Sequence, residues 1–203
     1  MKGKFLLVCA AALFSTSALA TGMFQPDGVQ PIDPKGDSAP QQMQLPPDPE
    51  GKAVELRLHG KCDQAIPILR NLTAINQNDE IAKFNLGQCL VDVSKTDADK
   101  GRAAHDAYEG AQWLLEAANH GLPNAQEGLI SVYLDGNGVA RNPVEAGKWS
   151  LIYRSNGMRF ALGLPDIPGD LQARLDRTLN EQAWDEARAE ADKWSPQNVA
   201  SEE

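Results

Sequence analysis

The residues of this chain best suited to covalent or metal chemistry are its cysteines and histidines. Two of the three cysteines, Cys62 and Cys89, lie outside the first twenty residues, and such a pair either forms a disulfide or remains as two buried thiols. His59 and His120 each precede a glycine at an expected helix end, where an imidazole can meet free backbone carbonyls. His105 completes the set, and we predict that no histidine binds a metal or acts in catalysis.

A glycine-rich loop and the acidic residue before it have the residue types of a phosphate loop or a calcium loop. Gly136-Asn137-Gly138 lacks the following Lys-Ser/Thr and the preceding strand of a phosphate loop. The twelfth position counted from Asp135 is Ala146, so a calcium loop would lack its bidentate glutamate. We therefore predict that the protein is not an enzyme and has no catalytic residue, no cofactor and no metal ligand.

The first twenty residues have the layout of a secretory signal peptide. Two lysines precede an apolar run over residues 5–14, and Ala18 and Ala20 are the small residues of a cleavage site. We predict cleavage after Ala20 and a periplasmic or secreted protein. An uncleaved anchor and lipid attachment at Cys9 are the alternatives.

An oxidising compartment favours a disulfide between Cys62 and Cys89. We expect Cys62 to begin one helix and Cys89 to lie late in the next. Two antiparallel helices that turn near Gln77 would bring these two ends together. In the chain-entropy account, closing this loop contributes roughly 3.6 kcal/mol to stability.

The composition is acidic, with 28 Asp and Glu against 19 Lys and Arg and a formal net charge of −9. Sequence-independent binding to nucleic acid needs clustered Lys and Arg, and docking on an anionic membrane also needs positive charge. No segment after residue 20 has the apolar length of a membrane span. We therefore expect no nucleic-acid partner, no membrane-embedded segment, and a protein partner with a neutral or basic surface.

Residues 21–49 hold seven of the thirteen prolines and few large apolar residues. Such a segment cannot bury enough surface to offset its ordering entropy, so we predict a disordered proline-rich lead. From residue 50 the pattern is that of amphipathic helices without an alternating, strand-like run, which predicts an all-α fold. Pro67 predicts a kink or a late start of its helix. The expected helices span residues 53–59, 61–76, 79–93, 103–119, 124–134, 143–155, 169–179 and 181–194.

Two parts of the helical region align at a fixed offset of 36 residues. Residues 108–113 (YEGAQW) align with residues 144–149 (VEAGKW), so one tryptophan recurs in register. At the same offset Gly121 meets Gly157, and we expect both glycines to end a helix.

A second alignment, at an offset of 43 residues, pairs residues 82–90 with residues 125–133. We expect the seven additional residues as a loop insertion within residues 94–101, because surface loops tolerate extra length. A fixed period of this size is typical of helix pairs stacked into a solenoid.

The run from Ala125 to Gly157 resembles a Sel-one-like repeat, a subclass of the tetratricopeptide-like α-solenoids. The resemblance implies a right-handed α-solenoid of stacked antiparallel helix pairs over residues 50–196, with a C-terminal capping helix, and a flexible tail over residues 197–203. The positions that the repeat alignments assign to the core are Ala82, Leu86, Leu90, Trp113, Gly121, Ala125, Leu129, Tyr133, Ala146, Trp149 and Gly157.

Solenoids of this family usually bind another protein on a concave surface and share no catalytic residue. The resemblance therefore implies an extracytoplasmic repeat scaffold, an adaptor or regulator in the bacterial envelope. A secreted hydrolase of the β-lactamase-like, cysteine-rich repeat type and a structural envelope component are the alternatives. Gln88 and Ser131, as non-consensus positions on the first helix of each pair, are expected to line the partner-binding face.

Overall fold

The computed structural model describes residues 48–197, which all belong to one compact unit, Met43–Glu203. The predicted signal peptide over residues 1–20, residues 21–47 of the predicted lead and residues 198–203 of the predicted tail lie outside the described residues.

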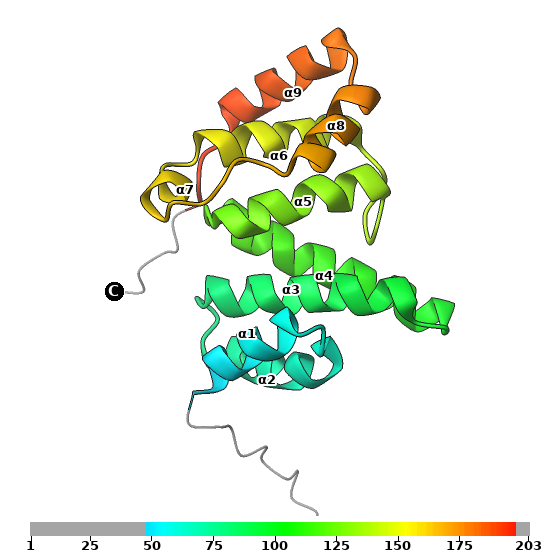
Figure 1. Cartoon of the computed structure of the whole chain (residues 1–203), viewed down its shortest axis with the longest axis vertical. Coiled ribbons are helices and arrows are strands. Elements are labelled where there is room, and N and C mark those ends of the chain that lie inside the picture. Colours follow the sequence, from blue (N-terminus) through cyan, green and yellow to red (C-terminus); the bar gives the residue numbers. More distant parts are fainter. Residues whose placement is uncertain (1–47, 198–203) are drawn as a thin grey trace, which may run out of the picture. The chain divides into compact units, whose positions relative to one another are not determined.

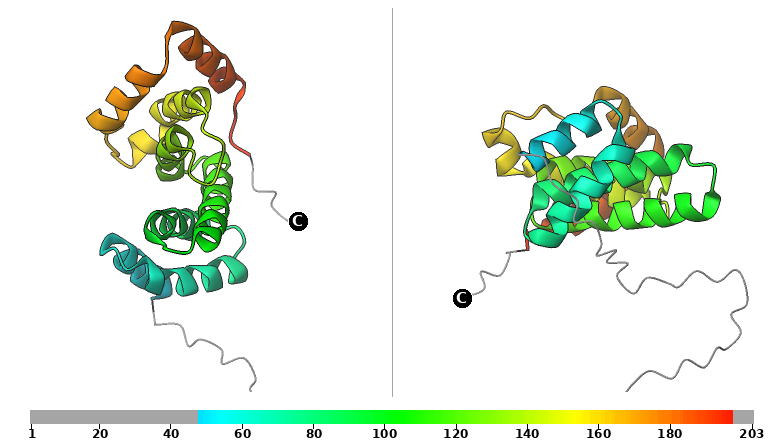
Figure 2. Two further views of the ribbon diagram at one scale, coloured as in Figure 1. Left: turned by 90° about the vertical axis from the view of Figure 1, so that its right-hand side faces the viewer. Right: turned by 90° about the horizontal axis from the view of Figure 1, so that it is seen from below.

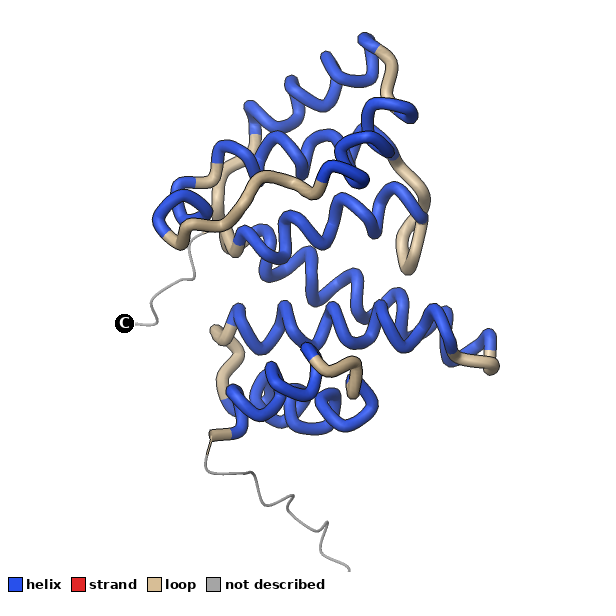
Figure 3. Tube along the Cα trace, in the orientation of Figure 1, coloured by secondary structure: helices blue, strands red, loops and turns tan. Residues whose placement is uncertain are grey.

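The described part of the chain consists of nine helices and contains no strand, so the predicted all-α class is confirmed (Figure 3). Six of these helices begin after an Asp or Asn whose side chain accepts a hydrogen bond from a backbone N–H of the first turn. The helices are α1 (Pro49–Leu58), α2 (Cys62–Ile75), α3 (Glu80–Thr96), α4 (Lys100–Asn119), α5 (Pro123–Asp135), α6 (Pro143–Ser155), α7 (Gly157–Ala161), α8 (Gly169–Thr178) and α9 (Glu181–Lys193).

Two prolines affect the helix starts differently from our expectation. Helix α1 begins at Pro49, earlier than predicted, because proline is favoured in a first turn and the Asp48 side chain accepts from the Gly51 N–H. Pro67 was expected to cause either a kink or a late start of its helix, and of these two the late start is wrong, because α2 contains Pro67 and begins at Cys62. Its residues Ala65 and Leu69 are fully buried, and this packing outweighs the hydrogen bond that the proline cannot donate.

The seven additional residues of the second alignment do not form a loop insertion. Helix α3 continues to Thr96 and α4 begins at Lys100, so only residues 97–99 connect them. The additional residues lengthen the helices instead, to 17 and 20 residues against 13 each for α5 and α6. Asp99 makes this short connection possible because its carboxylate accepts from two backbone N–H groups at the start of α4.

Gly157 does not end a helix, so this prediction is wrong. Gly121 has a φ of +90°, as expected of a glycine that closes a helix, whereas Gly157 is exposed and is the first residue of the short helix α7. The reason lies in the preceding residue, since the Asn156 side chain accepts from the Met158 N–H and starts a new helix.

Consecutive helices pack on one another from α1 to α6, and α9 then lies on α6 at the other end of this unit (Figure 1, Figure 2). Helices α3 and α4 approach closely at Gly87 and Gly110, where a Cβ on Gly110 would lie 2.7 Å from the Gly87 carbonyl oxygen. Helices α6 and α9 approach at Gly147, where a Cβ would lie 3.1 Å from the Ala187 Cβ. No described helix has both the length and the apolar character needed to cross a membrane.

The buried side chains form two hydrophobic clusters. One joins α1, α2 and α3 and contains Cys62 and Cys89, whose sulfurs lie at disulfide distance and whose Cα atoms are 5.0 Å apart. The other extends from α3 and α4 to α9. Of the predicted repeat-core residues, Trp113 and Tyr133 are half-buried and Gly157 is exposed, and the rest are buried: Ala82, Leu86, Leu90, Gly121, Ala125, Leu129, Ala146 and Trp149.

Candidate functional site

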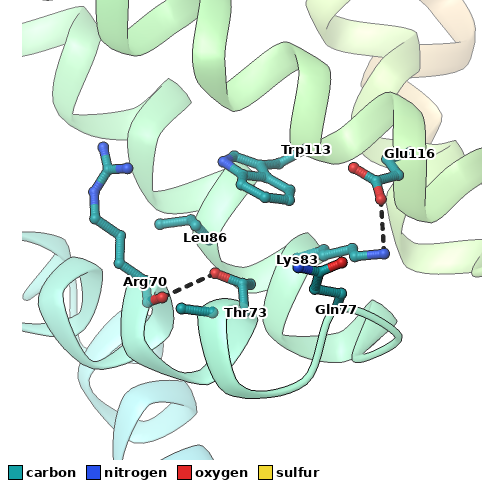
Figure 4. Close-up of a pocket in the computed structure, with 8 residues that line it drawn as sticks. Arg70, Thr73, Gln77, Lys83, Leu86, Trp113 and Glu116 are labelled. Carbon is teal, nitrogen blue, oxygen red and sulfur yellow. Dashed lines mark hydrogen bonds and ion pairs between the residues drawn. The ribbon is translucent and has the colours of Figure 1, made fainter.

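A groove runs beside α4 and consists of two hollows that share Trp113 and Glu116. The first, of about 400 Å³, lies between α2, α3 and α4 and is drawn in Figure 4. The second, of about 280 Å³, is lined by one face of α4 alone. We call the two hollows together the α4 groove. Its lining residues are Arg70, Thr73, Ala74, Gln77, Lys83, Leu86, His105, Tyr108, Glu109, Gln112, Trp113 and Glu116.

Helical spacing places the α4 residues of this groove on one face. Tyr108, Gln112 and Glu116 follow one another at intervals of four residues, and such positions lie one above the other along a helix. Tyr108 is 59% exposed, and the Trp113 ring stands between α3 and α4 in the first hollow. The groove therefore presents two aromatic side chains from one rigid helix.

The two tryptophans that align in the sequence have different surroundings. Trp149 on α6 is 1% exposed and packs edge-on against Trp194, with ring centroids 6.0 Å apart. Trp194 directly follows α9, the helix that lies on α6. Trp113 is half-buried and borders both hollows of the α4 groove. Helix α9 thus covers the face of α6 that carries Trp149, whereas the face of α4 that carries Trp113 is partly open.

An ion pair fixes one wall of the groove. Arg70 of α2 donates from Nη1 and Nη2 to the two carboxylate oxygens of Glu109, with an Nη2–Oε2 distance of 2.6 Å. The Trp113 indole N–H donates to the same carboxylate at 3.2 Å. The hydrogen bonds from Arg70 hold the pKa of Glu109 below its ordinary value, against the opposing effect of burial. The pair therefore stabilises the fold at neutral pH, and this contribution is lost as the pH falls through the lowered pKa.

A second ionic network lies at the other end of the first hollow. The Lys83 side chain is 2% exposed, and its Nζ lies 3.0 Å from Glu80 Oε1 and 2.8 Å from Glu116 Oε1. His120 Nδ1 lies 2.6 Å from the same Glu80 oxygen. Burial acts to lower the pKa of Lys83, but the hydrogen bonds with Glu116 and Glu80 outweigh it, and the pKa is raised. Lys83 is therefore charged at neutral pH and connects α3 to α4 beneath the groove.

We expect Lys83→Met to lower the free energy of unfolding by about 2 kcal/mol, because two carboxylates lose their buried partner while the apolar volume is kept. The control is Lys95→Met, since Lys95 pairs with Asp92 across exposed side chains and should change stability by less than about 0.5 kcal/mol. Urea unfolding followed by circular dichroism measures both values. Equal effects of the two substitutions would contradict a structural role for the buried network.

The two residues expected to bind a partner, Gln88 and Ser131, do not line the α4 groove. Gln88 lies on α3 and Ser131 on α5, and both are close to Gly128. A Cβ on Gly128 would be 3.4 Å from Gln88 Oε1, and the Gly128 carbonyl accepts from Ser131 Oγ at 3.0 Å. Gln88 donates to Asp92 one turn further along α3.

The groove itself was not predicted from the sequence, which assigned Leu86 and Trp113 to the core, although one signal was available. Tyr108 aligns with Val144, so a large aromatic residue stands where the aligned stretch has a smaller aliphatic one. The exposure of Tyr108 and the burial of Lys83 depend on neighbours distant in the sequence.

The three histidines lie in three different environments. His59 Nδ1 lies 2.7 Å from the Glu55 carbonyl oxygen at the end of α1, as expected of a histidine at a helix end. His120, in contrast, meets a carboxylate of another helix. His105 is grouped with Asp106 and Glu109 on the exposed side of α4, with possible ligand atoms within 4.8 Å of one another. These are residue types that bind metals, but both Glu109 oxygens already accept from Arg70.

The glycine-rich loop makes packing contacts. Asn137 Nδ2 donates to Ser94 Oγ at 3.3 Å, which ties the loop to the end of α3. Gly138 lies directly on α4, since a Cβ there would be 2.0 Å from the Ala107 carbonyl oxygen. This loop therefore braces α4 next to Tyr108.

No protein-family model, curated protein or solved structure matches this chain. A functional proposal therefore depends on the chemistry of the α4 groove and on the sequence patterns described above.

Proposed function

We propose that the protein is an extracytoplasmic helical-repeat scaffold that binds a segment of another protein in the α4 groove and acts as an adaptor or regulator in the bacterial envelope. The observation that carries this proposal is the pairing of exposed Tyr108 with half-buried Trp113 on one rigid helix, beside walls fixed by ion pairs. The proposal includes a right-handed solenoid arrangement of the helix pairs.

Four further features support this proposal. Neighbouring helices pack in succession, as the stacking of helix pairs requires. The N-terminal pattern of a signal peptide and the cysteine pair at disulfide distance both fit an oxidising compartment outside the cytoplasm. The aligned tryptophans fit a repeat architecture.

The groove favours a peptide segment over a small cofactor. Binding energy at protein interfaces concentrates in aromatic and arginine residues that are surrounded by a polar rim, and Tyr108 and Trp113 offer such anchors. The surface that lines the second hollow is mostly apolar, and its carboxylate and imidazole side chains are those of Glu109, Glu116 and His105. A segment with an apolar side chain for the hollow and a neutral or basic residue beside it fits this chemistry.

Site-specific photocrosslinking in intact cells tests the proposal. A photoreactive amino acid at position 112, which is exposed beside both aromatic residues, should give one discrete protein adduct. The matched control is position 182, an exposed glutamine on α9 outside the groove, where we expect no such adduct. The same adducts at both positions, or none at position 112, would contradict the proposal.

A further inference from the structure

A small hollow away from the α4 groove brings three arginines together. It has a volume of about 220 Å³ and lies where α5 ends and α8 ends. Its lining residues are Leu134, Arg141, Arg174, Arg177 and Thr178. The volume corresponds to several water molecules at about 30 Å³ each, which is enough for a phosphate-sized anion with part of its hydration shell.

Separate contacts hold two of these arginines at the hollow. Arg141 Nε donates to the Leu134 carbonyl oxygen at 2.9 Å, and Gly136, with a φ of +70°, turns the chain so that Arg141 packs beside it. Arg174 Nη2 donates to Asp135 at the end of α5. Arg177 lies one turn further along α8 and is exposed, and its side chain makes no hydrogen bond or ion pair within residues 48–197.

Three guanidinium groups gather at this hollow although the chain as a whole is acidic, with a net charge of −9. Of the acidic side chains nearby, Asp135 is paired with Arg174, and Asp176 accepts from Gln172 on α8. The C-termini of α5 and α8 together supply roughly one unit of partial negative charge. Asp135, Asp176 and these helix ends together roughly balance the three positive charges. The Nη groups of Arg141 and the whole guanidinium of Arg177 nevertheless make no hydrogen bond within residues 48–197, so these N–H donors remain available to an oxyanion.

We propose that this hollow, the arginine pocket, is a binding site for a phosphate-class oxyanion, either free phosphate or a phosphate monoester on a larger molecule. Guanidinium groups present paired N–H donors that match the oxygens of phosphate, and three such groups line this hollow. The arginine pocket shares no residue with the α4 groove. A negative result for phosphate binding would therefore leave the proposed scaffold function untouched, and a negative crosslinking result would leave the arginine pocket untouched.

Phosphorus-31 NMR titration of the purified mature protein tests this site with inorganic phosphate, at constant ionic strength balanced with chloride. We expect saturable binding by the wild-type protein and binding at least about tenfold weaker in Arg141→Gln/Arg177→Gln. Arg177→Gln alone should weaken binding by about fivefold without changing the unfolding midpoint, because Arg177 makes no contact that the fold needs. O-Phosphoserine in a parallel titration separates the two sources, since tighter binding than inorganic phosphate assigns the site to a phosphate monoester.

The matched control is Arg102→Gln/Arg188→Gln, which removes the same charge from two exposed arginines that pair with Asp97 and Asp185. This variant should bind phosphate as the wild-type protein does. Equal weakening in both double variants would show a general charge effect and overturn the site. Absence of saturable binding in the wild-type protein would also overturn it and leave the arginines as caps of the two helix ends.

Discussion

Gly138→Ala is expected to lower the free energy of unfolding by about 3 kcal/mol. Gly138 has a φ of +79°, and the left-handed conformation costs roughly 1–2 kcal/mol for a residue with a Cβ. The new Cβ would also lie 2.0 Å from the Ala107 carbonyl oxygen, and overpacking of this kind costs about 1–3 kcal/mol. Urea unfolding followed by circular dichroism measures the sum.

Two other glycines separate the contributions. Gly163 has a φ of +66° with open space around its Cβ position, so Gly163→Ala should cost only the conformational part, about 1 kcal/mol. Gly157 has neither a positive φ nor a neighbour within 4 Å, so Gly157→Ala should leave stability within about 0.5 kcal/mol of the wild-type value. If Gly138→Ala costs no more than Gly163→Ala, the loop does not pack on α4.

Gly138→Ala should also weaken binding in the α4 groove. The Cβ at position 138 would lie 2.8 Å from the Tyr108 backbone nitrogen, so the loop can accommodate it only by moving away from α4 or by displacing Tyr108. Asn137 would then lose its contact with the end of α3. A variant that remains folded should therefore show a weaker adduct at position 112.

Removing the disulfide should have the second large effect. Cys62→Ala/Cys89→Ala is expected to lower the free energy of unfolding by about 3.6 kcal/mol, because the unfolded chain regains the freedom of the closed loop. Both cysteines are buried between α2 and α3, in the cluster that also receives the Trp113 ring from α4. The loss should therefore loosen the first hollow of the groove along with α1 and α2.

The wild-type protein in reductant is the internal comparison, since its urea midpoint should approach that of the double variant. A thiol assay on the unreduced, denatured protein without residues 1–20, which contain Cys9, should find no free thiol. Two thiols per chain, or a double variant as stable as the oxidised wild-type protein, would contradict the bond.

Local signals explain why the helix positions were predictable. Helix α6 spans the predicted residues 143–155 because Asn142 accepts from two first-turn N–H groups and Pro143 suits the first helical position. The cysteine pair was predictable for the same reason, since the positions of two helices and one turn fix the approach of Cys62 and Cys89.

The features that the sequence left open depend on contacts between distant segments. Lys83 looks like an exposed helix residue, and its burial is possible because Glu116 on the neighbouring helix pairs with its charge. Gly157 has the residue type of a helix end, and only the cap formed by Asn156 makes it a helix start. The exposure of the α4 face around Trp113 could not be predicted from the alignment of Trp113 with Trp149. Helix α9 covers the face of α6 that carries Trp149, and it does not cover the face of α4 that carries Trp113.

The crosslinking yield at position 112 in intact cells tests the proposed scaffold function most directly. The yield is compared between the variants Tyr108→Ala and Phe160→Ala. Tyr108 and Phe160 are similarly exposed, at 59% and 62%, and only Tyr108 lines the groove. Tyr108→Ala should reduce the yield by about fivefold or more, as expected for loss of an anchor worth at least ~1 kcal/mol, whereas Phe160→Ala should leave it unchanged. A yield that Tyr108→Ala leaves unchanged, or that both substitutions reduce equally, would contradict binding in the α4 groove.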